Sequence, residues 1–466
     1  MAKYKAYPEY KDSGVEWLKA IPEHWKLSKL RYQFVFGKGL TITKEHLQDE
    51  GIPCVNYGEV HSKYGFEVDP EIHTLKCVSD KYLKDNSSSL LAKGDIVFAD
   101  TSEDIDGSGN FTQLVSDTVT FAGYHTIIAR PFERENSRFY AYLLDCKELR
   151  SQVRHAVKGV KVFSITQAIL RNLSIWLPSN DEQAKIAAFL DHETAKIDNL
   201  IEYQRQLIEL LKEKRQAVIS HAVTKGLNPD VTMKDSGVEW LGKVPEHWEL
   251  VPLKYLCNFS GGGTPTKDNL SYWQGGTVPW VSPKDMKSFW ISETQDYVTP
   301  KAVSESSTNY VEEGSLLMVV RSGILQRNIP VAINIVKVTM NQDMKALRFN
   351  ERMKAHYAAY FINGNVNSLL LEWTKEGATV ESIEHEYLAN GLIPVPPIDE
   401  QHSIIKSISD QMIRFELLEE KALTGIRLLQ ERRTALISAA VTGKIDVRDW
   451  IAPDTQDVEV SQEATA

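Results

Sequence analysis

Asp12 to Trp25 reads DSGVEWLKAIPEHW and Asp235 to Trp248 reads DSGVEWLGKVPEHW, so eleven of fourteen positions are identical. The match includes two tryptophans, a proline and a histidine, and chance does not explain it. A second match joins DEQ (181–183) to DEQ (399–401), and VISHAVT (218–224) to LISAAVT (436–442). The chain is therefore two copies of one unit, and such a repeat decides the fold before any single element does.

The two copies agree at their beginnings and ends and differ in the middle. The first match has an offset of 223 residues and the second an offset of 218, so a net difference of five lies in the divergent middle. We interpret the shared parts as a common scaffold and the divergent parts as surfaces that meet two different things. The alternative is an old duplication that drifted evenly, but even drift would not leave near-identity at both ends.

A long helix is expected after the first globular part. From Asp181 to about Lys225 the chain has no proline or glycine and is rich in helix formers. Ser179, Asn180 and Asp181 offer N-cap oxygens, and Gly226 suits a C-cap. The helix would have about 45 residues and a length of roughly 68 Å. Because this exceeds the width of a domain of about 170 residues, we expect the helix to extend beyond its own domain.

Apolar residues recur in steps of four and three in this helix and in its counterpart near the C-terminus, as in a coiled-coil seam. The candidates for helix pairing and partner binding are Ile186, Leu190, Ile197, Leu200, Leu207, Leu211, Ile404, Ile408, Phe415, Leu418, Leu429 and Leu436. Such a helix cannot bury its apolar stripe alone, so we expect antiparallel pairing about a pseudo-twofold axis. The alternative is that each helix folds back on its own domain.

These patterns predict an α+β chain with two mixed α/β domains separated by the two long helices. The expected segments are a first domain at 1–179, a central helix at 180–228, a second domain at 229–397, a C-terminal helix at 398–447 and a tail at 448–466. The tail is acidic and lacks periodicity, so we expect it to be disordered.

Composition restricts the class of protein. The 53 basic and 63 acidic side chains give a net charge of −10, which argues against nucleic-acid binding by bulk charge alone. The four cysteines, Cys54, Cys77, Cys146 and Cys257, form no CxxC pair, which excludes a zinc ribbon or a dense disulfide framework. We expect reduced, buried thiols. The N-terminus lacks the apolar core of a signal peptide, and apolar runs fall short of the roughly 20 residues of a membrane helix, so a cytoplasmic location is expected.

The sequence contains no motif that we can assign to catalysis or to metal binding. Gly261 to Gly263 is not followed by Lys-Ser or Lys-Thr, so it is no P-loop, and His385-Glu386 lacks the second histidine of a zinc-protease helix. There is no GxSxG elbow, no NPPY-type motif and no glycine-rich adenosylmethionine loop. Asp104 and Asp106 lie in a polar loop, where solvated turn residues are commoner than a metal site.

Basic side chains are the remaining candidates in the first copy. Residues 147–171 carry a net charge of +5 and include the candidate DNA contacts Lys147, Arg150, Arg154, Lys158 and Lys161. Arg150, Arg154 and Lys158 recur every four residues, which would place them on one helical face that suits phosphate oxygens. A solvated helix face is the alternative.

The second copy needs other contacts, because residues 365–389 contain one cation and five acids. Its candidates are Lys284, Lys287, Arg321, Arg327 and Asn328, in loops near Trp280 and after the apolar stretch Leu316 to Val320. Arg321, Arg327 and Asn328 have side chains that could read base edges in a groove. Any of them could equally be an ordinary surface residue.

Four of these features together resemble the specificity subunits of Type I restriction-modification systems. They are the repeated DSGVEWLG-x-VPEHW, the run GGTPT…VPWVSPKDM at 262–286, the turn Arg321-Ser322-Gly323, and the Asp-Glu-Gln start of each long helix. The resemblance covers about residues 11–447. Each piece alone is common, but the combination is highly specific.

The resemblance implies that each domain is a target recognition domain that reads one half of a split DNA sequence. It implies that the antiparallel helices act as a ruler between the half-sites and dock two methylation subunits, through which restriction subunits join. S-adenosylmethionine, ATP and magnesium would then bind those partners. This chain would be the non-catalytic subunit of a restriction enzyme and adenine-specific methyltransferase complex.

The first domain departs from the family wording. It has Gly37-Lys38-Gly39-Leu40-Thr41 in place of the GGTPT run, and Asp100-Thr101-Ser102 where the second domain has Val320-Arg321-Ser322. Base contacts therefore cannot be copied from one half to the other. Two other readings stay open: a coiled-coil scaffold with no role on DNA, and a single-chain restriction enzyme, which the missing nuclease and methylase motifs disfavour.

Overall fold

The computed structural model describes residues 4–157, 159, 162–374 and 381–452. It divides into two compact units, which we call unit 1 (Met1–Tyr203 with Thr424–Ala466) and unit 2 (Gln204–Leu423). The division passes through both long helices, because each unit contains the beginning of one helix and the end of the other. Most of the acidic tail that the sequence predicts to be disordered, from residue 453 on, lies outside the described residues.

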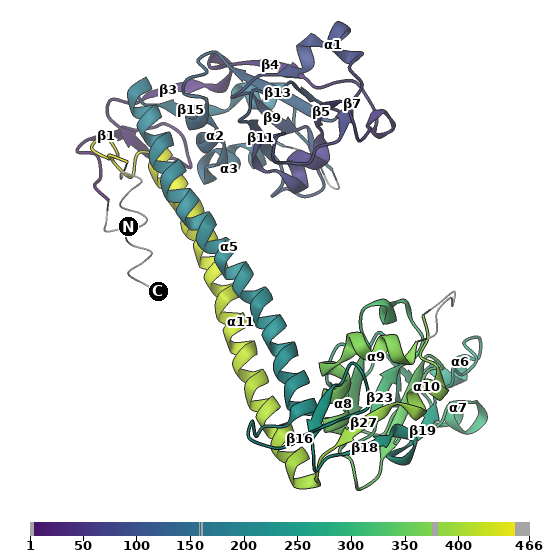
Figure 1. Ribbon diagram of the computed structural model, residues 1–466. Helices are drawn as coiled ribbons and strands as arrows, with labels where there is room; N and C mark the ends of the chain where they lie inside the picture. Colours follow the sequence, from purple (N-terminus) through teal and green to yellow (C-terminus); the bar gives the residue numbers. More distant parts are fainter. Residues whose placement is uncertain (1–3, 158, 160–161, 375–380, 453–466) are drawn as a thin grey trace. The chain divides into compact units, whose positions relative to one another are not determined.

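Unit 1 is built on a five-stranded sheet (Figure 1). Its order is β4 (Phe34–Lys38), β13 (Thr126–Pro131), β9 (Ile96–Ala99), β11 (Phe111–Leu114) and β6 (Phe66–Val68). Neighbouring strands are antiparallel except for the parallel pair of β11 and β6. Every residue of β9 and β11 is buried, so both faces of the sheet are covered there.

Smaller elements surround this sheet. A second sheet has the order β7 (Cys77–Val78), β5 (Ile52–Val55), β12 (Thr120–Ala122) and β8 (Leu90–Leu91). Strand pairs join β1 (Tyr10–Asp12) to β2 (Ala20–Pro22), β3 (Lys26–Lys29) to β15 (Ser174–Leu177), and β10 (Thr101–Ser102) to β14 (Phe163–Ser164). The short helices are α1 (Tyr82–Asp85), α2 (Ser137–Asp145), α3 (Lys147–Ala156) and α4 (Gln167–Asn172).

Unit 2 repeats this topology. Its main sheet has the order β19 (Cys257–Gly261), β26 (Met344–Phe349), β23 (Leu316–Val319), β24 (Val331–Asn334) and β21 (Trp290–Ile291), again with the parallel pair at the β21 edge. The smaller sheet is β22 (Asp296–Val298), β20 (Val278–Val281) and β25 (Thr339–Met340). Two further pairs are β16 (Met233–Asp235) with β17 (Lys243–Pro245), and β18 (Glu249–Pro252) with β27 (Leu392–Val395).

The short helices of unit 2 are α6 (Leu270–Trp273), α7 (Pro300–Glu305), α8 (Ala355–Gly364), α9 (Val366–Trp373) and α10 (His385–Asn390). The α8 helix is apolar and mostly buried, and it packs against β23, β24 and β26 of the main sheet. The two divergent middles of the sequence thus have one fold, and the predicted α+β class is confirmed.

The predicted long helices are α5 (Asn180–Lys225) and α11 (Ile398–Val441). In unit 1, the beginning of α5 and the end of α11 share one core, and Arg433 Nε of α11 lies 2.9 Å from Asp198 Oδ1 of α5. In unit 2, the end of α5 and the beginning of α11 share the other core, which contains Ile219 and Val223 of α5 and Ile404 of α11. The helices therefore pair antiparallel. Within each unit, the helix ends also pack against the domain of that unit.

The α11 helix stops at Val441, short of residue 447, the limit of the expected C-terminal segment. Gly443 has φ +73, a left-handed conformation that suits glycine, and it turns the chain back into unit 1. The N–H of Asp446 then donates to the carbonyl of Lys5 at 2.8 Å. Gly226, the predicted C-cap of α5, has φ +79 at the corresponding point of unit 2.

The heptad seam needs correction. Ile186, Leu190, Ile197, Ile404, Ile408 and Leu436 are buried, and Leu211, Phe415 and Leu429 are partly buried. Leu200, Leu207 and Leu418, however, are 47%, 41% and 45% exposed, and Ile201, Ile208 and Met412 are buried instead. A straight helix has about 3.6 residues per turn, so a strict 3.5-residue pattern drifts off the buried face over a few heptads.

Candidate nucleic-acid interface

Each unit has one edge where the repeated backbone carries unlike side chains. After β9 in unit 1, Thr101 pairs with Ser164, and the N–H of Ile165 donates to Asp100 O at 2.8 Å. After β23 in unit 2, Arg321 pairs with Ser382, and the N–H of Ile383 donates to Val320 O at 2.8 Å. We call residues 100–102 and 320–322 the crossover edges of the two units. Their backbone hydrogen bonds correspond.

The crossover edge of unit 2 has cationic and amide side chains. Arg321 is exposed, and the short helical turn that follows it leads to Arg327 and Asn328, which are also exposed. The hydroxyl of Ser322 caps this turn by accepting from the N–H of Ile324 at 3.4 Å. The structure thus brings three of the predicted residues to one loop. Guanidinium and amide groups of this kind suit both phosphate oxygens and base edges.

A lysine and a histidine lie beside the backbone of this edge. Lys345 Nζ is 3.0 Å from Nδ1 of His385, so the ammonium donates and Nδ1 accepts. Burial and the nearby Lys345 hold the pKa of His385 below its ordinary value, and burial lowers the pKa of Lys345. With Nδ1 accepting from Lys345, the other ring nitrogen, Nε2, carries a proton and can donate. The sequence singled out His385 only as a failed zinc motif.

Lys284 and Lys287 lie elsewhere in unit 2, in the loop between β20 and β21. Both are exposed, and neither side chain is paired with an acid among the described residues. The loop is held by Asp285, whose carboxylate accepts from the N–H of Ser282 at 2.8 Å and from the N–H of Gln295 at 2.8 Å. The two cations are therefore available on a fixed loop.

The crossover edge of unit 1 uses a different chemistry. His125 Nδ1 is 3.1 Å from Asp100 Oδ1, and His61 Nε2 is 3.2 Å from Ser102 Oγ. The ring of Tyr57 stacks on His61 with centroids 5.1 Å apart. This edge therefore offers imidazole, hydroxyl and carboxylate groups in place of Arg321. Sequence reasoning missed it because the contributing residues are scattered over more than sixty positions.

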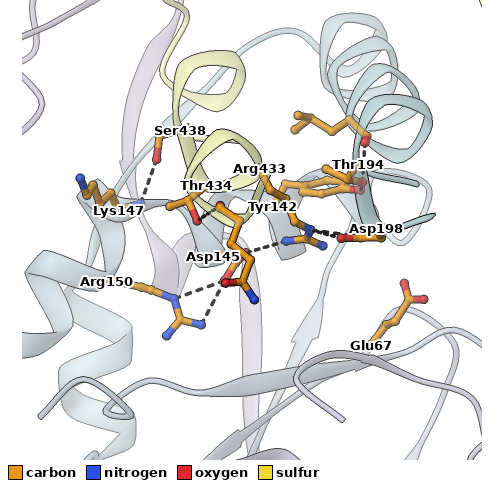
Figure 2. A network of polar contacts seen from close by, with 12 residues as sticks. Glu67, Tyr142, Asp145, Lys147, Arg150, Thr194, Asp198, Arg433, Thr434 and Ser438 are labelled. Carbon is orange, nitrogen blue, oxygen red and sulfur yellow. Dashed lines mark hydrogen bonds and ion pairs between the residues drawn. The ribbon is translucent and has the colours of Figure 1, made fainter. Parts of the chain in front are cut away.

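The predicted cation row of unit 1 is not a free face. Arg150 is 23% exposed and binds Asp145 at 3.0 Å (Figure 2). It also binds Asn110 at 3.1 Å, and Arg154 binds Asp106 at 3.3 Å. Helix α3 ends at Ala156, so a helical face does not continue to Lys158. Asp145 lies just outside the segment 147–171 whose charge was counted, and Asp106 comes from a distant loop, so the charge of that segment alone did not reveal these pairs. Lys158 and Lys161 lie outside the described residues.

The same region ties the first domain to the helix pair within unit 1. The N–H of Lys147 donates to Ser438 Oγ of α11 at 3.1 Å (Figure 2). Arg433 of α11 contacts Asp198 of α5 at 2.9 Å and Asp145 of α2 at 3.8 Å. One guanidinium thus joins three helices, and α3 serves as much to hold the domain as to present charge.

The repeated motifs meet each other at the start of each long helix. In unit 1 the buried carboxylate of Glu182 accepts from Trp25 Nε1 at 3.1 Å, from the hydroxyl of Tyr7, and lies 2.9 Å from His24 Nε2. In unit 2 Glu400 lies 2.7 Å from His247 Nε2. We call each arrangement a clasp. The clasps explain why Glu-His-Trp and Asp-Glu-Gln recur together: each pair fastens an N-terminal loop to a helix.

The glutamines of the two motifs complete the clasps. The Nε2 group of Gln183 donates to Pro178 O at 3.0 Å, and that of Gln401 donates to Pro396 O at 2.9 Å. These prolines stand at matching positions between the last strand of each domain and its long helix. Each glutamine therefore ties the first turn of its long helix to the proline segment that precedes it.

The described residues contain no cluster of three or more histidine, cysteine, aspartate or glutamate side chains suited to a metal ion. No helix in this part of the chain has the length and apolar content needed to span a membrane. All four cysteines are free and buried, as predicted, and burial raises the pKa of the Cys54 thiol to about 12.

The two units share one backbone arrangement and differ in the side chains of their crossover edges, as in a protein with two recognition domains. Residues 22–213 and 245–426 match the model of the Type I restriction modification DNA specificity domain, and the chain belongs to this family. It is a specificity subunit with two recognition domains. Specificity subunits are non-catalytic, and the methyltransferase is a separate subunit.

Individual relatives agree with this assignment. The chain is 34% identical over 198 residues to the EcoR124I/EcoR124II specificity subunit of Escherichia coli, covering 42% of this chain and 45% of that one. It is 24% identical over 437 residues to a putative MjaX specificity subunit of Methanocaldococcus jannaschii, covering 92% and 95%.

Two solved structures share the fold. One comes from work on assembly and conformational transition of a type I restriction-modification system, with a TM-score of 0.67, 16% identity, and coverage of 91% of this chain and 99% of that one. The other is the HsdS subunit of Thermoanaerobacter tengcongensis, with a TM-score of 0.53, 15% identity, and coverage of 91% and 98%.

Proposed function

We propose that this chain reads a bipartite DNA target with its two recognition domains and carries two methylation subunits, and through them restriction subunits. The observation that carries the proposal is the pair of crossover edges. The same backbone hydrogen bonds present Asp100, Thr101 and His125 in unit 1, and Val320, Arg321 and Asp343 in unit 2. Reading two different half-sites requires one backbone arrangement that presents different side chains in each unit.

An exchange of domains tests this proposal. Residues 30–175 are replaced by those of another family member, and the methylated positions in the host genome are mapped by single-molecule sequencing. Only one half of the recognised sequence should change. A change in both halves, or in neither, contradicts the assignment of one half-site to each domain.

Contacts with DNA in unit 2 are proposed for Arg321, Arg327 and Asn328, with Lys284 and Lys287 on phosphates. Arg321→Ala should weaken binding and relax the preference for bases in one half-site, at a cost of about 1–3 kcal/mol. Lys284→Ala should weaken binding to all sequences alike and reduce the salt dependence by about one phosphate contact. Arg352→Ala is the matched control, because this half-exposed arginine pairs with Glu249 at 2.6 Å.

Contacts in unit 1 are proposed for the crossover edge around His61 and His125 and, among the predicted cations, for Lys147. Arg150 and Arg154 serve mainly to hold α3 in place, since each has a carboxylate partner within 3.3 Å. His125→Ala should therefore alter the preference in the other half-site. Arg150→Ala should reduce stability more than base preference.

Docking of methylation subunits on the helix pair is supported by apolar side chains that the pairing leaves exposed. In unit 1 these include Leu200, Tyr203 and Leu428, and in unit 2 they include Leu207, Leu210, Ile413, Leu417, Leu418 and Leu423. Exposed apolar side chains in such numbers on α5 and α11 support an interaction surface there. The pure chain should transfer no methyl group from a methyl donor to DNA, whereas the complex should do so.

The helices are also proposed to set the gap between the half-sites. Inserting one helical turn into both α5 and α11 adds about 5.4 Å, which corresponds to between one and two base pairs at about 3.4 Å each. An unchanged gap would contradict the proposal that the helices set the distance between the half-sites. A scaffold with no role on DNA is the other candidate. Failure of the chain and its methylation subunit together to bind a bipartite duplex would favour it.

A further inference from the structure

The main sheet of each unit carries one lysine at an equivalent pair of residues on its two outermost strands. In unit 1, Lys38 of the edge strand β4 pairs with Ile127 of β13. In unit 2, Gly261 of the edge strand β19 pairs with Lys345 of β26. The pairs correspond by the offsets of the repeat, 223 residues on the edge strand and 218 on its neighbour. We call them the outer pairs.

The lysine of the outer pair has changed strand between the two units. Residues that lie directly opposite each other in an antiparallel pair project from the same face of the sheet. Lys38 and Lys345 therefore stand at the same place on the same face, although neither position keeps its residue. Both units thus have a cation at this place, whereas the crossover edges have a cation only at Arg321.

The lysines of the outer pairs have no counter-ion. Neither Lys38 nor Lys345 is paired with a carboxylate in the part of the chain that the structure describes. Lys345 is partly buried, and its Nζ donates to Nδ1 of His385 at 3.0 Å. This bond uses one of the three N–H groups of the ammonium and supplies no negative charge. A partly buried, uncompensated ammonium favours the binding of an anion.

A phenylalanine two residues before the outer pair has a cation over its ring in each unit. The ammonium of Lys345 lies 5.9 Å from the ring centroid of Phe259, and the guanidinium of Arg171 lies 5.6 Å from that of Phe36. Phe36 and Phe259 are equivalent by the offset of 223. Arg171 is exposed and likewise has no carboxylate partner among the described residues. The ring faces hold these cations without neutralising them.

A neutral hydrogen-bonding side chain completes each arrangement. His385 is exposed, and its Nε2 can donate because Nδ1 accepts from Lys345. Gln167 has the equivalent position in unit 1, 218 residues earlier, and its Nε2 donates to the carbonyl of Gly37 at 3.0 Å. Both residues are the first of a short helix, α10 and α4.

The outer pairs lie next to the crossover edges. In unit 2 the carbonyl of Asp343, two residues before Lys345, accepts from the N–H of Arg321 at 3.3 Å. In unit 1 the carbonyl of His125, two residues before Ile127, accepts from the N–H of Asp100 at 3.1 Å. A ligand that meets a crossover edge therefore passes close to a cation without a counter-ion.

We propose that the outer pair of each unit anchors a phosphate group of DNA, held by Lys38 in unit 1 and by Lys345 with His385 in unit 2. The inference rests on the proposed function, which brings DNA to the crossover edges. Phosphate contacts position a protein on the duplex and carry no sequence information. Both units can therefore use the same charge at the same place, whereas the crossover edges must differ.

The test measures how the chain with its methylation subunits binds two duplexes as the salt concentration is varied. One duplex carries the target mapped in the host genome, and the other has an unrelated sequence of the same length. Lys345→Met and Lys38→Met should each weaken binding to both duplexes by about tenfold at about 100 mM salt, the value of one charge-assisted hydrogen bond. Each should reduce the slope of log K against log salt by about 0.9, the release of one counter-ion. The methylated sequence should stay the same.

A rescue variant distinguishes the loss of charge from damage to the fold. A Cβ on Gly261 would meet no atom within 4 Å, so a lysine has room there, as Lys38 has at the equivalent position. Gly261→Lys combined with Lys345→Met should therefore restore both the affinity and the salt slope. Lys337→Met is the matched control, because this half-exposed lysine pairs with Glu312 at 2.7 Å, and it should change neither quantity.

The outcomes separate the inference from the proposed function. If Lys345→Met has the salt slope of the control, the outer pairs do not hold phosphates, and the proposed function is unaffected. If it weakens binding to the target duplex alone and changes the methylated sequence, Lys345 reads a base and the inference is wrong. If the variants bind DNA normally but lose a methylation subunit, the outer pairs serve an acidic protein surface, and the inference is again wrong. If the unmodified complex binds neither duplex, the proposed function fails and the inference fails with it.

Discussion

Replacing the glutamate of each clasp should have unequal effects, although the motif is the same. In unit 1 the carboxylate of Glu182 is 4% exposed and accepts from Trp25 and Tyr7 in addition to its contact with His24. Glu182→Ala leaves two buried donors unpaired, each worth about 1–3 kcal/mol, so the loss in local stability should be about 3 kcal/mol.

The equivalent change in unit 2 should cost far less. Glu400 is 28% exposed and contacts only His247, itself 45% exposed, while Trp248 Nε1 has no acceptor among the described residues. A partly exposed pair of this kind contributes at most about 1 kcal/mol. The same substitution therefore distinguishes how much the clasp contributes to stability in unit 1 from how much it contributes in unit 2.

Hydrogen exchange read by mass spectrometry resolves the two clasps in one sample. Glu182→Ala should speed exchange in β1 and β2 by about 100-fold, since 1.4 kcal/mol is a factor of ten. It should leave β16 and β17 unchanged, so unit 2 is the internal control. Glu182→Gln keeps an acceptor oxygen and should lose less than half as much. Equal effects of Glu182→Ala and Glu400→Ala would refute the reasoning.

Three further outcomes are expected. Gly443→Ala should destabilise its unit more than Gly226→Ala by about 1–2 kcal/mol in local exchange, because both have positive φ but only at Gly443 would a Cβ lie 2.4 Å from a neighbouring proline. Arg433→Met should lower the stability of unit 1 by about 1–2 kcal/mol, with a smaller loss in 1 M salt, as denaturant titrations would show. The imidazole of His385 should titrate below 6.5 by NMR, and Lys345→Met should raise its pKa, since burial and that ammonium lower it. Because the unfolded imidazole then binds a proton at a higher pH than the folded one, stability should fall as pH drops below about 7, and less so in Lys345→Met.

The sequence predicted the architecture because the repeat is a global signal. Two near-identical stretches at each end require two copies of one fold, whatever the divergent middles contain. The limits of α5 followed from the polar residues Ser179 to Asp181 and from Gly226, because capping depends on adjacent residues alone. The apolar seam of the long helices was harder to predict, because a heptad pattern assumes that the helices supercoil. In the structure Ile201 and Ile208 are buried in place of Leu200 and Leu207.

The candidate site was predicted less well, because a regular spacing of cations does not show which of them have partners. Arg150 and Arg154 looked like a free row, but Asp145, five residues before Arg150, and Asp106, from a distant loop, pair with them. The sequence did contain a signal for the clasps, because Glu-His-Trp and Asp-Glu-Gln are each repeated unchanged in both copies. Motifs that persist together in both copies are candidates for contact with each other.

The repeat also distinguishes two kinds of position by how they changed between the copies. Clasp residues stayed the same, because both units need the same joint. Crossover edges kept their backbone hydrogen bonds and exchanged their side chains: Thr101 pairs with Ser164 where Arg321 pairs with Ser382. The proposed reading of two different half-sites requires this combination, because a common backbone positions the contacts and only the side chains can distinguish one base sequence from another.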